Sequence, residues 1–170
     1  MSGNIVANFD IDALIAKATG IVQDVIDDIV LALKYACIDT VSAARALPSP
    51  PAEVRGTPHQ PHYIDDTGYL RGSIGYAIYK DGTLLADDFK GTENGNAGSG
   101  AAQGQEAGKN LAAEVAGQYV GQGIVAIVVC GADYAAAVES NGYDVLTGST
   151  KELANIFKDN LKQVKQRHGL

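Results

Sequence analysis

Apolar residues at helical spacing dominate the first third of the chain. From Phe9 to Leu47 they recur every three or four positions, which is the period of one face of an α-helix. The stripe consists of Ile11, Leu14, Ile15, Ala18, Ile21, Val22, Val25, Ile29, Leu33 and Ala36. Asp10 is expected to cap this helix, because its carboxylate can accept hydrogen bonds from free backbone N–H groups. Such a helix is longer than a domain of this size requires, which leaves room for contacts with neighbouring subunits as well as core packing.

Prolines end the long helix and begin a connector. Pro48, Pro50 and Pro51 lack a backbone donor and disfavour helix in the residue before them. Residues 48–62 are therefore predicted to form an extended, Pro-rich connector. A β-hairpin follows, with strands from Leu70 to Tyr79 and from Leu84 to Phe89. Asp81-Gly82 between them suits a tight primed turn.

Residues 91–104 contain five glycines and almost no large apolar side chain, which predicts a flexible Gly-rich loop. Gly104, Gly108 and Lys109 approach the spacing of a phosphate-binding loop. That spacing is one residue short, however, and Asn110 stands where the loop requires Ser or Thr. Nucleotide binding is therefore not expected.

The second half alternates helices with one strand. A helix is predicted over 105–119, and the β-branched run from Ile124 to Cys130 is typical of a central strand covered on both faces. Asp133 is expected to cap a short helix from Tyr134 to Glu139.

Ser149 and Glu152 have the spacing of a capping box at the start of a last helix. The apolar stripe of that helix consists of Leu153, Ile156, Phe157, Leu161 and Val164. The chain is thus predicted to be a single α+β domain, 1–170. Its long N-terminal helix packs on a small, mainly antiparallel sheet made of the hairpin and the central strand, with short helices and a C-terminal helix.

The net charge of −7, from 20 acidic and 13 basic residues, argues against general nucleic-acid binding. The charge is uneven, because residues 10–46 carry a net −3 and residues 151–167 a net +3. Two interpretations remain open: two solvated helix faces, or head-to-tail attraction between identical subunits.

Cys37 and Cys130 lie in apolar stretches, as small buried hydrophobic residues do, which is typical of a reducing compartment. The longest strongly apolar run, Ile124 to Cys130, is far shorter than the ~20 residues that span a bilayer. The N-terminus lacks the pattern of a signal peptide. A soluble protein that is made without export is expected.

No arrangement of nucleophile, base and orienting acid is found in the sequence. The paired carboxylates Asp65-Asp66, together with His59 and His62, define one alternative: a metal-dependent or small-ligand enzyme. Two histidines without a nearby cysteine make a poor metal site, however, and acids in a turn commonly cap it. The interpretation favoured by the residues is structural, with no cofactor, no metal and no catalytic residue.

Two segments with a distinctive order of residues carry most of the remaining information. The first supplies Asp66, Thr67, Gly68, Leu70, Arg71, Ser73 and Ile74. In it, Asp and Gly suit a turn, Leu70 and Ile74 are expected to face the core, and Arg71 is expected to reach outward or toward an acid such as Glu139. The second supplies Tyr134, Ala135, Val138 and Glu139.

In order and spacing the two segments resemble the "Asp-Thr-Gly-x-Leu-Arg-x-Ser-Ile" and "Tyr-Ala-x-x-Val-Glu" segments of the small neck and tail-completion proteins of long-tailed phages. The long helix ahead of them also fits. The likeness covers most of the chain from Asp10 to Leu161. It departs after Glu139, where the family commonly continues with Phe-Gly-Thr and this chain runs from Ser140 to Leu146 without it.

The resemblance implies a non-enzymatic structural protein of a phage or prophage virion, synthesised in the host bacterial cytoplasm. It implies a homo-oligomeric ring at the head–tail junction or at the tail end. Its partners would be further copies of itself and adjoining neck, connector or tail-tube proteins, with no membrane and no sequence-specific nucleic-acid binding. A protein-interaction adaptor unrelated to virions is the other alternative.

Overall fold

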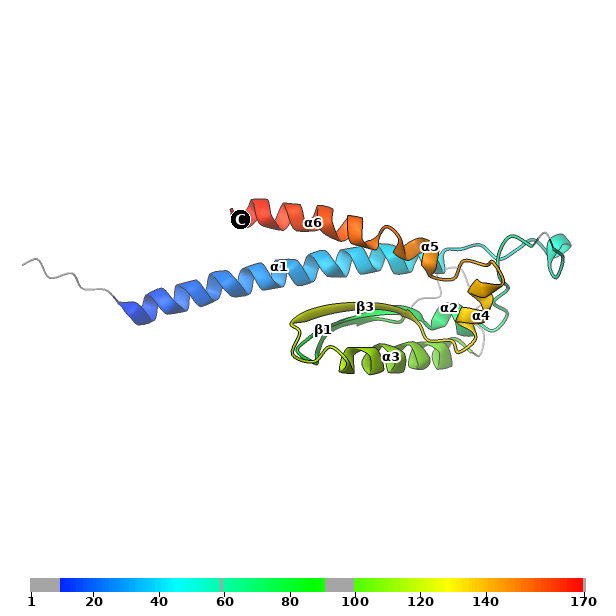
Figure 1. The fold of residues 1–170 in the computed structure, drawn as a ribbon, viewed down its shortest axis with the longest axis horizontal. Helices are drawn as coiled ribbons and strands as arrows, with labels where there is room; N and C mark the ends of the chain where they lie inside the picture. The colour runs from blue at the N-terminus through cyan, green and yellow to red at the C-terminus, as the bar shows by residue number, and fades with distance from the viewer. Residues whose placement is uncertain (1–9, 59, 91–99, 170) are drawn as a thin grey trace, which may run out of the picture.

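The computed structural model describes residues 10–58, 60–90 and 100–169, which form an α+β fold in layers (Figure 1). Its elements are α1 (Ile11–Arg45), the 3-10 helix η1 (Ala52–Val54), α2 (Tyr69–Gly72), β1 (Ile74–Lys80), β2 (Thr83–Asp88), α3 (Ala101–Gly117), β3 (Ile124–Cys130), α4 (Ala135–Ser140), α5 (Thr147–Thr150) and α6 (Leu153–His168). The sheet lies between α1 on one face and α3 on the other, and α6 packs on α1. The predicted fold class is confirmed.

The long helix α1 begins as expected. The Asp10 carboxylate accepts a hydrogen bond from the Ala13 amide at 2.9 Å, which satisfies one of the free donors of the first turn. The helix ends at Arg45, three residues before Pro48. Its predicted boundaries are therefore correct to within two residues.

The sheet is antiparallel in the order β2-β1-β3. Asp81 and Gly82 take φ of 50° and 88°, as the predicted primed turn requires. The prediction that residues 124–130 form the central strand is wrong, because β1 occupies the centre and β3 an edge. The prediction that both faces of this strand are covered is correct, since its alternate side chains pack on the α1 side and the α3 side.

The hairpin starts later than its alternation predicts. Residues 69–72 form the short helix α2, and the strand begins at Ile74 rather than Leu70. Gly68 enters α2 in the left-handed conformation with φ 73°, and the Asp65 carboxylate accepts from the Arg71 amide at 3.1 Å. These two groups stabilise a helical turn where the side-chain pattern alone indicates a strand.

Helix α3 begins at Ala101, inside the segment predicted as a loop, while residues 91–99 lie outside the described residues. Its buried face consists of Gly104, Gly108, Ala112 and Ala116. A Cβ on Gly108 would lie 2.5 Å from the Ser73 carbonyl oxygen, and one on Gly104 would overlap the Tyr69 carbonyl. The glycines therefore permit close packing of α3 on α2 and β1, which a loop does not need.

Two predicted caps are wrong. Asp133 makes no capping bond, and Tyr134 precedes α4 instead. Ser149 lies inside α5, and α6 starts after Glu152 without a side-chain cap. Gly169, in the left-handed conformation, ends α6.

The sheet separates two hydrophobic cores. Cys37, Leu70 and Ile74 belong to the core beneath α1, and Phe89 and Ala112 to the core over α3. Both cysteines are free thiols, and burial raises the pKa of Cys37 to about 11. None of the helices in the described ranges combines the length and the apolar character that crossing a bilayer requires.

Candidate assembly site

The two distinctive segments meet in space at one end of the sheet. The rings of Tyr69 and Tyr134 stack with centroids 6.0 Å apart. The Ser73 hydroxyl donates to the Leu70 carbonyl at 2.7 Å and accepts from the Ala132 amide at 3.0 Å. Residues about sixty positions apart thus form one joint between α2, β1 and the start of α4.

Most residues of the first segment serve this joint. Leu70 and Ile74 are buried in the core, as predicted. The Thr67 hydroxyl accepts a hydrogen bond from the Tyr69 amide at 3.3 Å, and Gly68 supplies the left-handed turn. Asp66 is exposed.

Arg71 lies inside the protein, and the prediction that it reaches outward is wrong. Its side chain is 1% exposed, its guanidinium donates to the Leu47 carbonyl, and the group lies 5.4 Å from the centroid of the Tyr63 ring. A buried guanidinium needs such acceptors, because desolvation of the charge is otherwise costly. Arg71 therefore ties α2 to the residues that flank the connector on both sides.

In the second segment, Glu139 caps the following helix. Its Oε1 accepts from the amides of Leu146 at 2.8 Å and Thr147 at 2.9 Å, and its Oε2 accepts from the Thr147 hydroxyl at 2.8 Å. Partial burial acts to raise the pKa of this carboxyl. The hydrogen bonds outweigh that effect, and the pKa lies below its ordinary value. Ala135 and Val138, which lie with Glu139 in α4, pack against the core.

The alternative metal set is not assembled among the described residues. Asp65 is buried and occupied with the Arg71 amide, while Asp66 is exposed beside it. His62 contributes its carbonyl to Gln60, and His59 lies outside the described residues. No group of three or more His, Cys, Asp or Glu side chains in the described ranges is close enough to hold a metal ion.

Arg45 is an anchor that the sequence does not single out. Its Nε and Nη2 donate to the Ile74 carbonyl at 3.1 and 2.7 Å, and Nη1 lies 3.8 Å from the Asp88 carboxylate. The last turn of α1 is thereby fixed to β1 and β2. A single arginine in the last turn of a helix carries no signal that would predict this burial.

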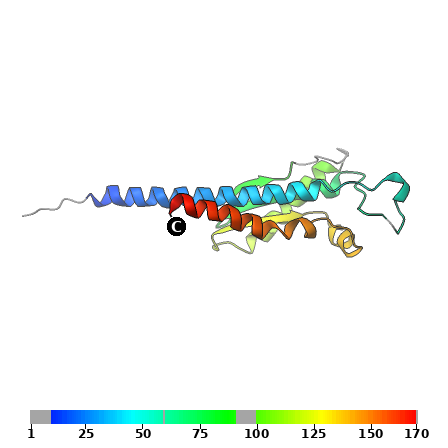
Figure 2. The same cartoon turned by 90° about the horizontal axis from the view of Figure 1, so that it is seen from above.

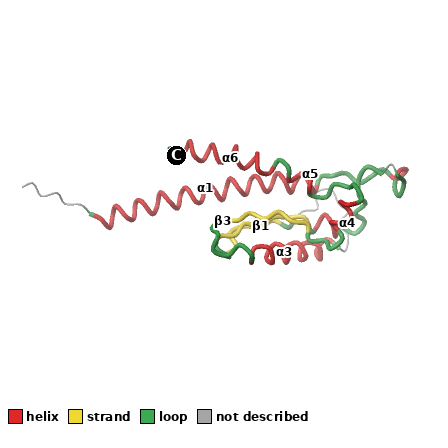
Figure 3. The backbone as a smooth tube through the Cα atoms, viewed as in Figure 1, coloured by secondary structure: helices red, strands yellow, loops and turns green. Residues whose placement is uncertain are grey.

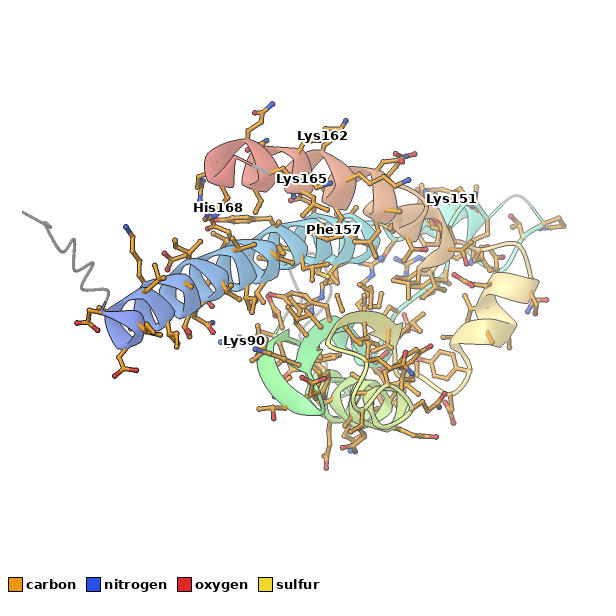
Figure 4. The ribbon with its side chains drawn as sticks, turned by 60° about the vertical axis from the view of Figure 1, so that its left-hand side comes forward. Lys90, Lys151, Phe157, Lys162, Lys165 and His168 are labelled. Carbon is orange, nitrogen blue, oxygen red and sulfur yellow. The ribbon has the colours of Figure 1, made fainter. Side chains whose placement is uncertain are left out.

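The complementary charges of the two long helices meet within one chain. Asp28 of α1 accepts from Arg167 at 2.8 Å and from His168 at 2.8 Å. Figure 4 shows His168 and Phe157 where α6 meets α1. The hydrogen bond from His168 is the largest cause that holds the pKa of Asp28 below its ordinary value. Part of the charge asymmetry is thus explained by packing inside the subunit.

The first part of α1 extends beyond the sheet and beyond α6 (Figures 2 and 3). All residues from 11 to 24 are exposed, including Ile11 at 64% and Leu14 at 65%. The exposed large side chains of this projecting segment, residues 11–25, are Ile11, Leu14, Ile15, Ile21 and Val22. They continue the stripe that is buried farther along the same helix. The projecting segment therefore presents an apolar face that no described residue of its own chain covers.

No family model, curated protein or solved structure matches this chain.

Proposed function

We propose that this chain is a structural phage or prophage virion protein of the neck or tail-completion type. It assembles with further copies of itself into a ring at the head–tail junction or the tail end, without catalysing a reaction. Its neighbours are adjoining neck, connector or tail-tube proteins. The resemblance of the two segments to that family supplies the class.

One observation carries the proposal: a long apolar helix face is exposed on a chain whose distinctive residues are engaged in structural contacts. A contiguous apolar face on a protein surface marks a surface that binds another molecule. Arg71, Ser73 and Glu139 hold a rigid body together, and that body positions the projecting segment. This combination suits assembly better than catalysis.

Deleting the gene from the phage or prophage that carries it tests the role. Filled heads and separate tails are expected in the lysate, and expression of the wild-type gene from a plasmid should restore joined virions. Joined, infectious virions from the deletion would overturn the proposal. Growth of the host without the prophage is expected to be unaffected.

A further inference from the structure

Part of the sheet beside α1 is left uncovered by the described residues. Helix α1 packs on β1 and β3, whereas Leu85 and Ala86 of β2 line an open groove with Ile26 and Val30 of α1. The groove has a volume of about 410 Å³. Within the described part of the chain, the outer edge of β2 pairs with no other strand. An apolar strip beside an open strand edge is a surface that another chain can cover.

The rim of this groove is mainly basic. Lys34 of α1 and Lys80 of β1 line it, and neither forms an ion pair with another described residue. Asp27 is the acid of the rim, and its carboxylate accepts from Gln23 at 2.7 Å. The groove therefore suits an apolar helix that carries a net negative charge.

The projecting segment is such a helix. At about 1.5 Å per residue, residues 11–25 extend some 22 Å. Asp10, Asp12 and Asp24 against Lys17 give residues 10–25 a net charge of −2. Because α1 is continuous, its projecting segment cannot reach the groove of its own chain.

We propose that the projecting segment of one copy lies in the groove between α1 and β2 of the next copy. The contact deepens the proposed assembly function and rests on it. It joins two different surfaces, so that repetition with a suitable rotation closes a ring. Within a subunit, the apolar stripe of α1 packs on β1 and β3. The projecting part of the same stripe would cover β2 of the neighbouring copy and bring its Asp12 and Asp24 near that copy's Lys34 and Lys80.

Two other occupants fit less well. If two projecting segments paired with each other, two helices of the same net charge of −2 would come together and repel. The outward surface of α6 is basic, with Lys158, Lys162 and Lys165. Leu161 is the one apolar side chain among the described residues that line it. It therefore lacks the apolar area to receive Ile11, Leu14 and Ile15.

Cross-linking between two differently tagged variants tests the contact. Leu14→Cys and Leu85→Cys replace exposed side chains, so both proteins should fold. They are mixed at the highest soluble concentration and treated with a short bismaleimide. The expected product is a dimer carrying both tags, at least tenfold above the yield from either variant alone. Ala16→Cys, on the opposite face of α1, replaces Leu14→Cys in the matched control mixture, and the wild type controls for Cys37 and Cys130.

A dimer formed by Leu14→Cys alone would show that two helices pair with each other and would overturn the proposal. A mixed yield no higher than that of the Ala16→Cys control would overturn it too. If cross-linking fails in this way but the gene deletion still accumulates filled heads and free tails, the contact is wrong and the assembly function stands. Joined virions from the deletion would remove that function instead.

Charge reversal supplies a second readout. Lys34→Glu with Lys80→Glu should weaken the contact by about tenfold, as measured from the concentration dependence of cross-linking. Asp12→Lys with Asp24→Lys in the other copy should restore most of it. If the aspartate reversal does not restore the contact weakened by the lysine reversal, the proposed pairing is contradicted.

Discussion

Tyr69 and Tyr134 stack with ring planes inclined by 29°, which joins the start of α2 to the start of α4. The two residues lie sixty-five positions apart, and each belongs to one of the two distinctive segments. Together with Ser73 they turn two separate sequence patterns into one structural unit. This unit fixes α2 and α4 to one end of the sheet.

The stack should be measurable as a coupling energy. Tyr69→Leu and Tyr134→Leu, alone and combined, are expected to give a coupling of about 0.5–1.5 kcal/mol in urea unfolding, because offset aromatic stacking adds to area burial. Tyr69→Leu combined with Tyr119→Leu, an exposed tyrosine elsewhere, serves as the control cycle and should give additive effects. Additivity of the first pair would show that the stack does not join α2 to α4.

The glycines of α3 should be separable by position. Gly108→Ala is expected to destabilise the protein by about 1–3 kcal/mol, because the added methyl would meet the Ser73 carbonyl at 2.5 Å and the Phe89 ring at 2.7 Å. A Cβ added at Gly117 of the same helix would meet no atom within 4 Å, so Gly117→Ala should stabilise the protein by about 0.5 kcal/mol. Thermal unfolding of the two variants checks both. A stabilising Gly108→Ala would contradict the close packing of α3 on β1.

Glu139→Ala should cost about 1–2 kcal/mol, since three backbone amides and the Thr147 hydroxyl lose their acceptor. Glu139→Gln keeps one acceptor oxygen without the charge, so its loss of stability should lie between those of the wild type and Glu139→Ala. The pKa of Glu139 is lower in the folded state than its ordinary value of 4.5, so its stabilisation is complete above that value. It is lost as the pH falls through the folded pKa. Acid unfolding of the Glu139→Gln protein should therefore depend less on pH below 4.5 than that of the wild type.

Asp28→Asn should loosen the end of α6. The Arg167 and His168 contacts depend on the carboxylate, so faster amide hydrogen exchange is expected in the last two turns of α6. Asp159→Asn is the matched control, because Asp159 pairs with Lys162 on the outer face of the same helix and should leave exchange unchanged. The lowered pKa of Asp28 predicts the same loosening in the wild type as the pH falls below the ordinary value of 3.8. Unchanged exchange in Asp28→Asn would show that the apolar stripe alone holds α6.

Several features set by local chemistry were predictable from the sequence. The period of α1, its Asp10 cap, the Asp81-Gly82 turn and the limits of β3 each depend on residues adjacent in the chain. The start of α2 was not predictable in this way. The Asp65 carboxylate accepts a hydrogen bond from the amide of Arg71, six residues later, and this bond favours a helical turn over the strand that the side-chain pattern indicates.

The remaining errors have both local and non-local causes. Gly104 falls in the predicted loop 91–104, although its spacing of four from Gly108, which continues through Ala112 and Ala116, indicates one small-residue face of a helix. The burial of Arg71 depends on Leu47 and Tyr63, which only the fold brings near. Likewise, an apolar stripe on α1 does not reveal which part its own chain covers, and the exposed part is the candidate assembly site.

Electron microscopy of lysates from the gene deletion, complemented by variants of the projecting segment, shows whether the exposed apolar face is needed to join heads and tails. Leu14→Asn with Ile15→Asn disrupts the exposed apolar face, whereas Ala16→Gln changes the opposite face of the same helix. Filled heads and separate tails are expected with the first variant and joined virions with the second. Joined virions from the uncomplemented deletion would contradict the proposed assembly function.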